Sequence, residues 1–142
     1  MASNVLVAVD GSEQSFDALE YAASEFGDAT ITALTVLDPA EVGAGTEVAM
    51  AVNADEWMAT AEKRAESHFE KARGIADETG VDLVTETEIG RPARTIVEVA
   101  EEGGFDHVVM GSHGREGVSR ILLGSVAESV VRRSPVPVTV VR

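Results

Sequence analysis

The residues best suited to binding chemistry gather in one stretch near the C-terminus. Four glycines stand in residues 111–124, and Ser125 follows the last of them. Glycine allows positive φ and leaves backbone N–H groups unscreened by a side chain. Residues 106–110, which end in Val108, Val109 and Met110, predict a buried strand before this loop, and a helix is predicted after it. A strand, a glycine loop and a helix N-terminus together predict a binding site for an anion such as a phosphate.

The start of the predicted helix carries its own signal. Ser125 and Glu128 match the S-x-x-E pattern of a capping box, which places the helix start at Ser125. The first amides of a helix have no intrahelical acceptor, so the N–H groups of residues 124–126 are expected to face a ligand. If the Ser125 hydroxyl caps its own helix, it is less free to bind a phosphate, but the amides serve in either case.

The glycine spacing is Gly111-x2-Gly114-x9-Gly124-Ser125, the chain opens with NVLVAVDGSEQS after three residues, and it closes with SPVPVTVVR. From end to end this sequence resembles the universal stress protein family, and the spacing is similar to that of the family's ATP-binding branch. The alternative interpretation is that these glycines only shape a tight connection between a strand and a helix.

The resemblance implies a bound adenine nucleotide, ATP or else AMP or ADP, with Mg²⁺ or Mn²⁺ possible beside its phosphates. It also implies that Val36 lines the adenine pocket. Ala8 stands where a proline is often seen in ATP-binding members, and we expect this difference to matter little. The residues that the resemblance assigns to the nucleotide are Ala8, Asp10, Val36, Met110, Gly111, Ser112, His113, Gly114, Arg115, Gly124, Ser125 and Val126.

Asp10 closes the first apolar run, residues 4–10, which is typical of a strand buried on both faces. In an open α/β sheet, ligands bind at the carboxyl ends of the strands. Asp10 is therefore a candidate to accept a ribose hydroxyl or to hold a divalent cation together with the phosphates. The alternative is a turn residue whose carboxylate bonds the amides of Ser12 and Glu13.

Strands and helices are predicted to alternate along the whole chain. This alternation predicts a single-domain α/β fold, a doubly wound five-stranded parallel sheet with helices on both faces. The family order, 3-2-1-4-5, would bring Asp10 and Gly111 together where the first and fourth strands meet. Strands are predicted at 4–10, 30–37, 81–89, 106–110 and 138–141, and helices at 12–26, 55–79, from Pro92 to before Gly103, and at 125–133.

Residues 40–54 show no clear period and are longer than most connections in a compact domain. We interpret the segment around 39–54 as a flexible flap beside the nucleotide. A plain surface loop is the alternative.

Composition narrows the class of protein. The 142 residues suit one domain, and the absence of cysteine excludes disulfides, thiol catalysis and thiolate metal sites. There is no apolar run long enough to span a membrane, so we expect a cytoplasmic protein without a membrane partner. Acidic residues number 25 against 11 basic ones, which argues against a nucleic-acid partner and resembles proteins of salt-adapted organisms.

The charge is unevenly distributed. Residues 107–142 hold five arginines and two glutamates, a balance of +3, whereas the first 106 residues carry a balance of −17. The glycine loop thus lies in the one part of the chain with a positive balance, as a phosphate site favours.

Two functional hypotheses follow. The first is a regulatory module: a homodimer, paired through the C-terminal strand at 137–141, that responds to nucleotide occupancy. The second is a slow ATP hydrolase or adenylate-processing enzyme in the same cleft, in which His113 is a candidate base or merely a ligand contact. The sequence has no G-x4-G-K-[ST] motif, so a P-loop ATPase is excluded and enzymatic activity is the less favoured hypothesis.

Overall fold

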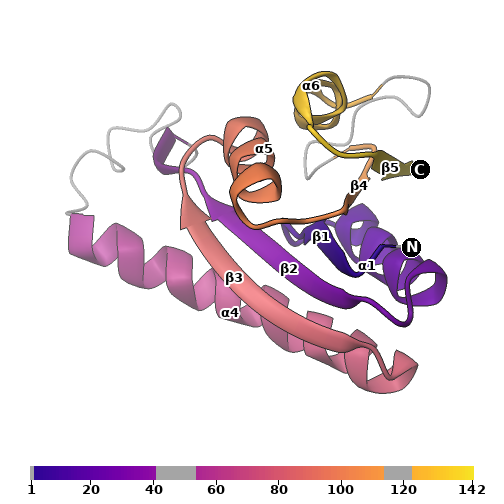
Figure 1. The fold of residues 1–142 in the computed structure, drawn as a ribbon. Coiled ribbons are helices and arrows are strands. Elements are labelled where there is room, and N and C mark those ends of the chain that lie inside the picture. Colours follow the sequence, from indigo (N-terminus) through magenta and orange to yellow (C-terminus); the bar gives the residue numbers. More distant parts are fainter. Residues whose placement is uncertain (1, 41–53, 114–122) are drawn as a thin grey trace.

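The computed structural model describes residues 2–40, 54–113 and 123–142. Its centre is a sheet of five parallel strands in the order β3-β2-β1-β4-β5, which confirms the predicted fold and strand order (Figure 1). The strands are β1 (Asn4–Ala8), β2 (Thr30–Leu37), β3 (Asp82–Ile89), β4 (His107–Gly111) and β5 (Val138–Val141).

Helices cover both faces of this sheet. In Figure 1, α1 and α4 lie on one side, and α5 and α6 lie on the other. The helices are α1 (Glu13–Glu25), α4 (Ala54–Thr79), α5 (Pro92–Glu102) and α6 (Ser125–Arg133). The flap predicted at residues 39–54 falls, except at its ends, outside the described residues.

Local residue types account for the starts of two helices. The Ser12 side chain caps α1 by accepting a hydrogen bond from the Ser15 amide at 3.1 Å. Pro92 occupies the first turn of α5, where its missing N–H costs nothing. The first strand ends at Ala8, earlier than the predicted Asp10, although the Val9 amide still donates to the Leu34 carbonyl at 2.8 Å.

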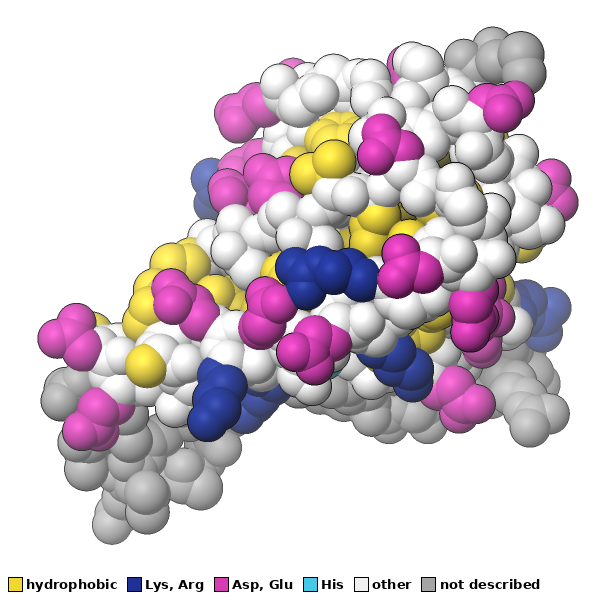
Figure 2. All heavy atoms as spheres, turned by 90° about the horizontal axis from the view of Figure 1, so that it is seen from below, with side chains coloured by type: hydrophobic (Ala, Val, Ile, Leu, Met, Phe, Trp, Pro, Cys, Tyr) yellow, Lys and Arg dark blue, Asp and Glu magenta, His cyan; other side chains and the backbone are white. Residues whose placement is uncertain are grey.

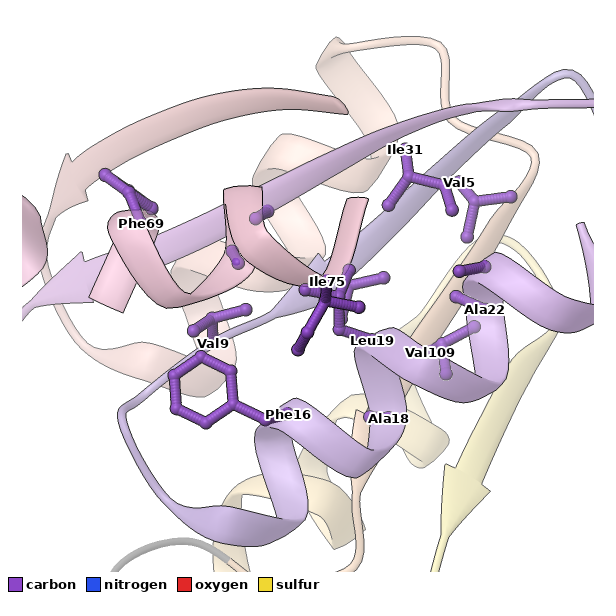
Figure 3. Packing of buried hydrophobic residues seen from close by; sticks show 14 of the residues in the cluster. Val5, Val9, Phe16, Ala18, Leu19, Ala22, Ile31, Phe69, Ile75 and Val109 are labelled. Carbon is purple, nitrogen blue, oxygen red and sulfur yellow. The ribbon is translucent and has the colours of Figure 1, made fainter. Parts of the chain in front are cut away.

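The larger core lies between the sheet and the α1/α4 layer (Figure 3). Strand side chains such as Val5 and Ile31 meet Leu19 of α1, and all three are fully buried. Phe69 and Ile75 bring α4 onto the same cluster. Strands that are apolar on both faces can bury a helix layer on each, which explains the continuous apolar runs of β1 and β2.

The second core lies under α5 and α6. Leu6 and Leu34 point to this face of the sheet and pack with Ile96 of α5 and Val130 of α6. Burying an apolar side chain of this size stabilises the fold by roughly 1.5–3 kcal/mol. In the part of the chain that the structure describes, no helix has the length and apolar character needed to cross a membrane.

Asp106 joins the starts of β1 and β4. Its carboxylate accepts hydrogen bonds from the Ser3 amide at 2.8 Å, the Ser3 hydroxyl at 2.9 Å and the Asn4 amide at 2.9 Å. The Ser3 and Asn4 amides are the main cause of the lowered pKa of Asp106, and the Ser3 hydroxyl adds to them.

We expect Asp106→Asn to reduce stability at neutral pH, because the charged acceptor of three hydrogen bonds is lost. A carboxyl group with a lowered folded-state pKa stabilises the fold above its ordinary value of 3.8 and loses that contribution as the pH falls through the folded-state pKa. Urea unfolding across the acid range measures the difference between variant and wild type, which should shrink with falling pH. Glu20→Gln, at an exposed acid on α1, is the control; a difference that grows in acid would contradict the assignment.

Candidate functional site

The carboxyl ends of β1 and β4 are neighbours in the sheet, so Asp10 and Gly111 lie at the same edge. The Asp10 carboxylate accepts a hydrogen bond from the Ser12 amide at 2.9 Å, as the turn interpretation predicted for Ser12. This bond uses Oδ1 alone. A carboxylate has two oxygens, so Asp10 retains acceptor capacity for a ligand.

Gly111 allows close packing. A Cβ at this position would lie 3.0 Å from the Gln14 Cβ and 3.1 Å from the Gln14 carbonyl carbon. The first turn of α1 therefore rests directly on the end of β4, and any side chain at position 111 would push the two elements apart by a few tenths of an ångström. This structural role is independent of any ligand contact.

Gln14 connects α1 to the start of the glycine loop, and sequence reasoning missed it. Its Oε1 accepts hydrogen bonds from the His113 amide at 2.8 Å and from the Ser112 hydroxyl at 3.2 Å. The Ser112 hydroxyl also lies 3.0 Å from Nδ1 of His113. Nothing in the local sequence of a glutamine in a helix signals a contact 99 residues away.

Both ends of the loop are held by Ser112. Its carbonyl accepts a hydrogen bond from the Gly124 amide at 2.7 Å, and its amide donates to the Val141 carbonyl of β5 at 2.8 Å. The Gly124 amide was expected to be an unpaired donor, and that expectation is wrong, because the protein itself uses this N–H to close the loop.

The capping box predicted at Ser125 is also wrong. Gly124 is the N-cap, with no side-chain cap, and its carbonyl accepts the first helical bond from the Glu128 amide at 3.0 Å. Glu128 instead pairs with Arg132, one turn along, at 2.8 Å. The amides of 125–127 thus precede the first intrahelical bond, and the exposed Ser125 hydroxyl is not spent on capping.

The other predicted site residues divide into two groups. Met110 is buried, and Ala8, Val36 and Val126 are half-buried; all four pack in the cluster under α5 and α6. Gly114 and Arg115 lie outside the described residues.

A pocket of about 50 Å³ opens between the end of β2 and α4. It contains Asp10 and Val36, two residues predicted for the nucleotide, together with α4 residues that were not among the predicted site residues. The full lining is Asp10, Thr35, Val36, Leu37, Asp38, Trp57, Ala61, Arg64, Ala65 and His68.

His68 lies in this pocket together with Asp10 and Arg64. Burial lowers the pKa of His68 below its ordinary value of 6.5; the Asp10 carboxylate opposes that shift, and Arg64 adds to it. Burial and the Arg64 guanidinium together outweigh Asp10 and favour the neutral imidazole.

Gly11 lets the His68 ring cover the turn after β1. Gly11 has φ +87°, in the left-handed region, and a Cβ placed there would overlap Nε2 of His68. Glycine is thus needed at this turn both for the backbone conformation and for the ring.

Comparison with known proteins decides the family. The universal stress protein family matches residues 1–142. The chain belongs to the universal stress protein family. Universal stress protein MJ0531 of Methanocaldococcus jannaschii is 37% identical over 145 residues, which cover 97% of this chain and 81% of that protein.

Solved structures of the family share the fold. Universal stress protein UspA from Lactobacillus plantarum is 28% identical, with a TM-score of 0.81 over 99% of this chain and 97% of that one. A universal stress protein solved in complex with cAMP is 27% identical, with a TM-score of 0.73 over the same shares of the two chains.

The contact between Gly11 and His68 can be tested against a matched glycine. Gly80 has φ +78°, and a Cβ added there meets none of the described atoms within 4 Å. We expect Gly80→Ala to cost about 1–2 kcal/mol from backbone conformation alone. Gly11→Ala should cost clearly more, since it adds the overlap with His68.

Urea unfolding of both variants measures the two costs. The double variant Gly11→Ala/His68→Ala lacks the imidazole ring. It should regain the part of the unfolding free energy that the overlap removed, while the cost of the left-handed backbone conformation remains. Equal costs for the two glycine variants would show that the ring does not press on this turn.

Proposed function

We propose that this protein binds an adenine nucleotide at the carboxyl edge of β1 and β4 and acts as a nucleotide-dependent regulatory module of the stress response, in the manner of the family's ATP-binding branch. The observation that carries the proposal is that Asp10 follows β1 beside the end of β4, while Ser112, just after β4, accepts a hydrogen bond from the Gly124 amide at the start of α6. This edge is where open α/β sheets bind ligands, at the point where the strand order reverses.

The phosphates are assigned to the start of α6. The amides of 125–127 have no intrahelical acceptor, and the exposed Ser125 hydroxyl adds a further donor. A helix N-terminus favours negative charge, and α6 lies in the part of the chain with a positive charge balance. Gly114 and Arg115 complete the proposed phosphate loop by family resemblance.

The nucleoside is assigned to the other side of the same edge. The remaining acceptor capacity of Asp10 suits a ribose hydroxyl, and Val36 borders the pocket beside it. An adenine-containing ligand is supported by the family member solved with cAMP. We extend the assignment to Ala8, Met110, Gly111, Ser112, His113, Gly124 and Val126 as residues that border the nucleotide.

A divalent cation would be held mainly by the phosphates. Within the described ranges, no group of three or more His, Asp or Glu side chains is arranged to bind a metal. Mg²⁺ commonly takes one or two carboxylates together with phosphates and water, and Asp10 fits that limited role. The cation, Mg²⁺ or Mn²⁺, would neutralise phosphate charge.

A binding role is favoured over fast catalysis by the placement of the lysines. The two lysines of the chain are at positions 63 and 71, both on α4, and the ammonium of Lys71 sits 4.4 Å from the ring centroid of Phe16. No lysine follows β4 to act on a γ-phosphate, as one does in P-loop enzymes. Slow hydrolysis in the same cleft is the alternative.

We also propose a homodimer formed through residues 137–141, and no nucleic-acid partner. β5 is the last strand in the sheet order, and each of its residues is half-buried, which suits an edge that a second copy covers. Figure 2 shows acidic side chains spread over one face of the molecule, with basic side chains among them. The net charge of −14 would repel nucleic acid.

Gly124→Val tests the nucleotide site. We expect calorimetry with ATP and Mg²⁺ to show binding by the wild type and at least about tenfold weaker binding by the variant, because a branched side chain would enter the phosphate position. Gly74→Val is the control, since Gly74 is exposed on α4. Circular dichroism confirms that both variants fold.

Unchanged ATP affinity in a folded Gly124→Val protein would remove the phosphate assignment. The rates of ATP turnover by the wild type and by Asp10→Asn distinguish a regulatory module from an enzyme. Turnover well above one per minute that collapses in Asp10→Asn would favour the enzyme instead.

Val140→Lys tests the dimer. We expect light scattering to give twice the chain mass of 14.9 kDa for the wild type and the single mass for the variant, because a charge would be buried at the paired edge. Val84→Lys, at an exposed position of β3 on the opposite edge, is the control. A monomeric wild type would refute the dimer.

A further inference from the structure

The hydrogen bonds around Gln14 determine where the protons lie on Ser112 and His113. The His113 amide is an obligatory donor and lies 2.8 Å from the Gln14 side chain, so the carboxamide must present its oxygen there. The orientation of Gln14 therefore follows from chemistry, because its NH₂ group could not accept this bond.

The Ser112 hydroxyl has one proton and two neighbours. Gln14 Oε1 is 3.2 Å away and Nδ1 of His113 is 3.0 Å away. The carboxamide oxygen has no proton to give, so this contact is a hydrogen bond only if Ser112 donates. Its oxygen must then accept from His113, which requires the proton on Nδ1.

The opposite arrangement is worse. If Ser112 donated to Nδ1, two oxygens with no proton between them would face each other at 3.2 Å, and the ring proton would sit on Nε2. Nε2 is buried with no partner among the described residues, and His113 is only 4% exposed. A buried N–H without an acceptor destabilises the fold, because it has lost its hydrogen bond to water and gained none in return. With the proton on Nδ1, every donor in the group is satisfied.

We propose that Gln14, acting through Ser112, is a positioning residue that holds His113 as the Nδ1–H tautomer and leaves Nε2 as a bare acceptor at the start of the glycine loop. No described residue pairs with this buried nitrogen, and a buried polar atom without such a pair calls for a ligand partner. An acceptor selects a ligand group that carries a proton, and phosphate oxygens carry none. A hydroxyl or amino group of the nucleoside is the matching chemistry.

The tautomer does not rest on the proposed nucleotide binding, whereas the ligand contact does. The His113 tautomer is measured in the protein without ligand, by ¹⁵N–¹H correlation of the imidazole rings at about pH 8, where an ordinary imidazole is neutral. His113→Gln assigns its signals among the three histidines. We expect a pyridine-type Nε2 and a pyrrole-type Nδ1; the reverse pattern in the wild type would overturn the proposal.

Variants test the role of Gln14. Gln14→Leu and Ser112→Ala should shift His113 toward the Nε2–H form, whereas Gln14→Glu, which keeps an acceptor oxygen, should retain the wild-type pattern. Glu13→Leu, at the exposed neighbouring position, is the control. If Gln14→Leu folds with an unchanged His113 pattern, Gln14 does not position this ring.

Two ligands test the contact itself. ATP should move the Nε2 signal of His113, and tripolyphosphate, which lacks the nucleoside, should not. If calorimetry shows ATP binding but the signal stays in place, the ligand contact is wrong. If ATP does not bind at all, the proposed function fails while the tautomer assignment stands. An equal response to tripolyphosphate would exclude a nucleoside donor.

Discussion

The close approach of α1 to the end of β4 is the constraint on which the rest of the site depends. With no side chain at Gly111, the backbone of Gln14 can rest on the strand, and the Gln14 carboxamide then reaches past it to Ser112 and His113. A methyl group at Gly111 would push the two elements apart by a few tenths of an ångström and so lengthen these hydrogen bonds. The packing of α1 on β4 and the geometry at the start of the glycine loop therefore depend on each other.

This constraint changes how the glycine loop is understood. The protein itself uses the amides of Ser112, His113 and Gly124, which bond to β5, α1 and Ser112 respectively. Those bonds fix both ends of the loop before any ligand arrives. A loop whose two ends are already held loses less conformational entropy on binding than a loop with free ends. The donors left at the start of α6 then become the natural place for negative charge.

The other side of the edge is built by α4. His68 covers Gly11 and, with Trp57 and Arg64, encloses the pocket beside Asp10. This helix also packs on the α1 side of the core through Phe69, so the pocket wall is part of the hydrophobic layer (Figure 3). A change in the core under α4 would therefore be felt at the proposed nucleotide site.

The sequence by itself determined the helices and strands and their alternation, and the family resemblance supplied the strand order that brings the candidate site to one edge of the sheet. Apolar runs, helix periodicity and signals such as Ser12 and Pro92 act over a few residues, and alternation of strands and helices allows few topologies. Only the tertiary structure decided which amides bond within the protein and that Gly124 and not Ser125 caps α6. It also decided that Gln14 contacts Ser112 and His113, and that His68 lines the pocket beside Asp10. These depend on contacts between residues far apart in the chain, and hydrogen-bond geometry of that kind leaves no periodic trace in a sequence.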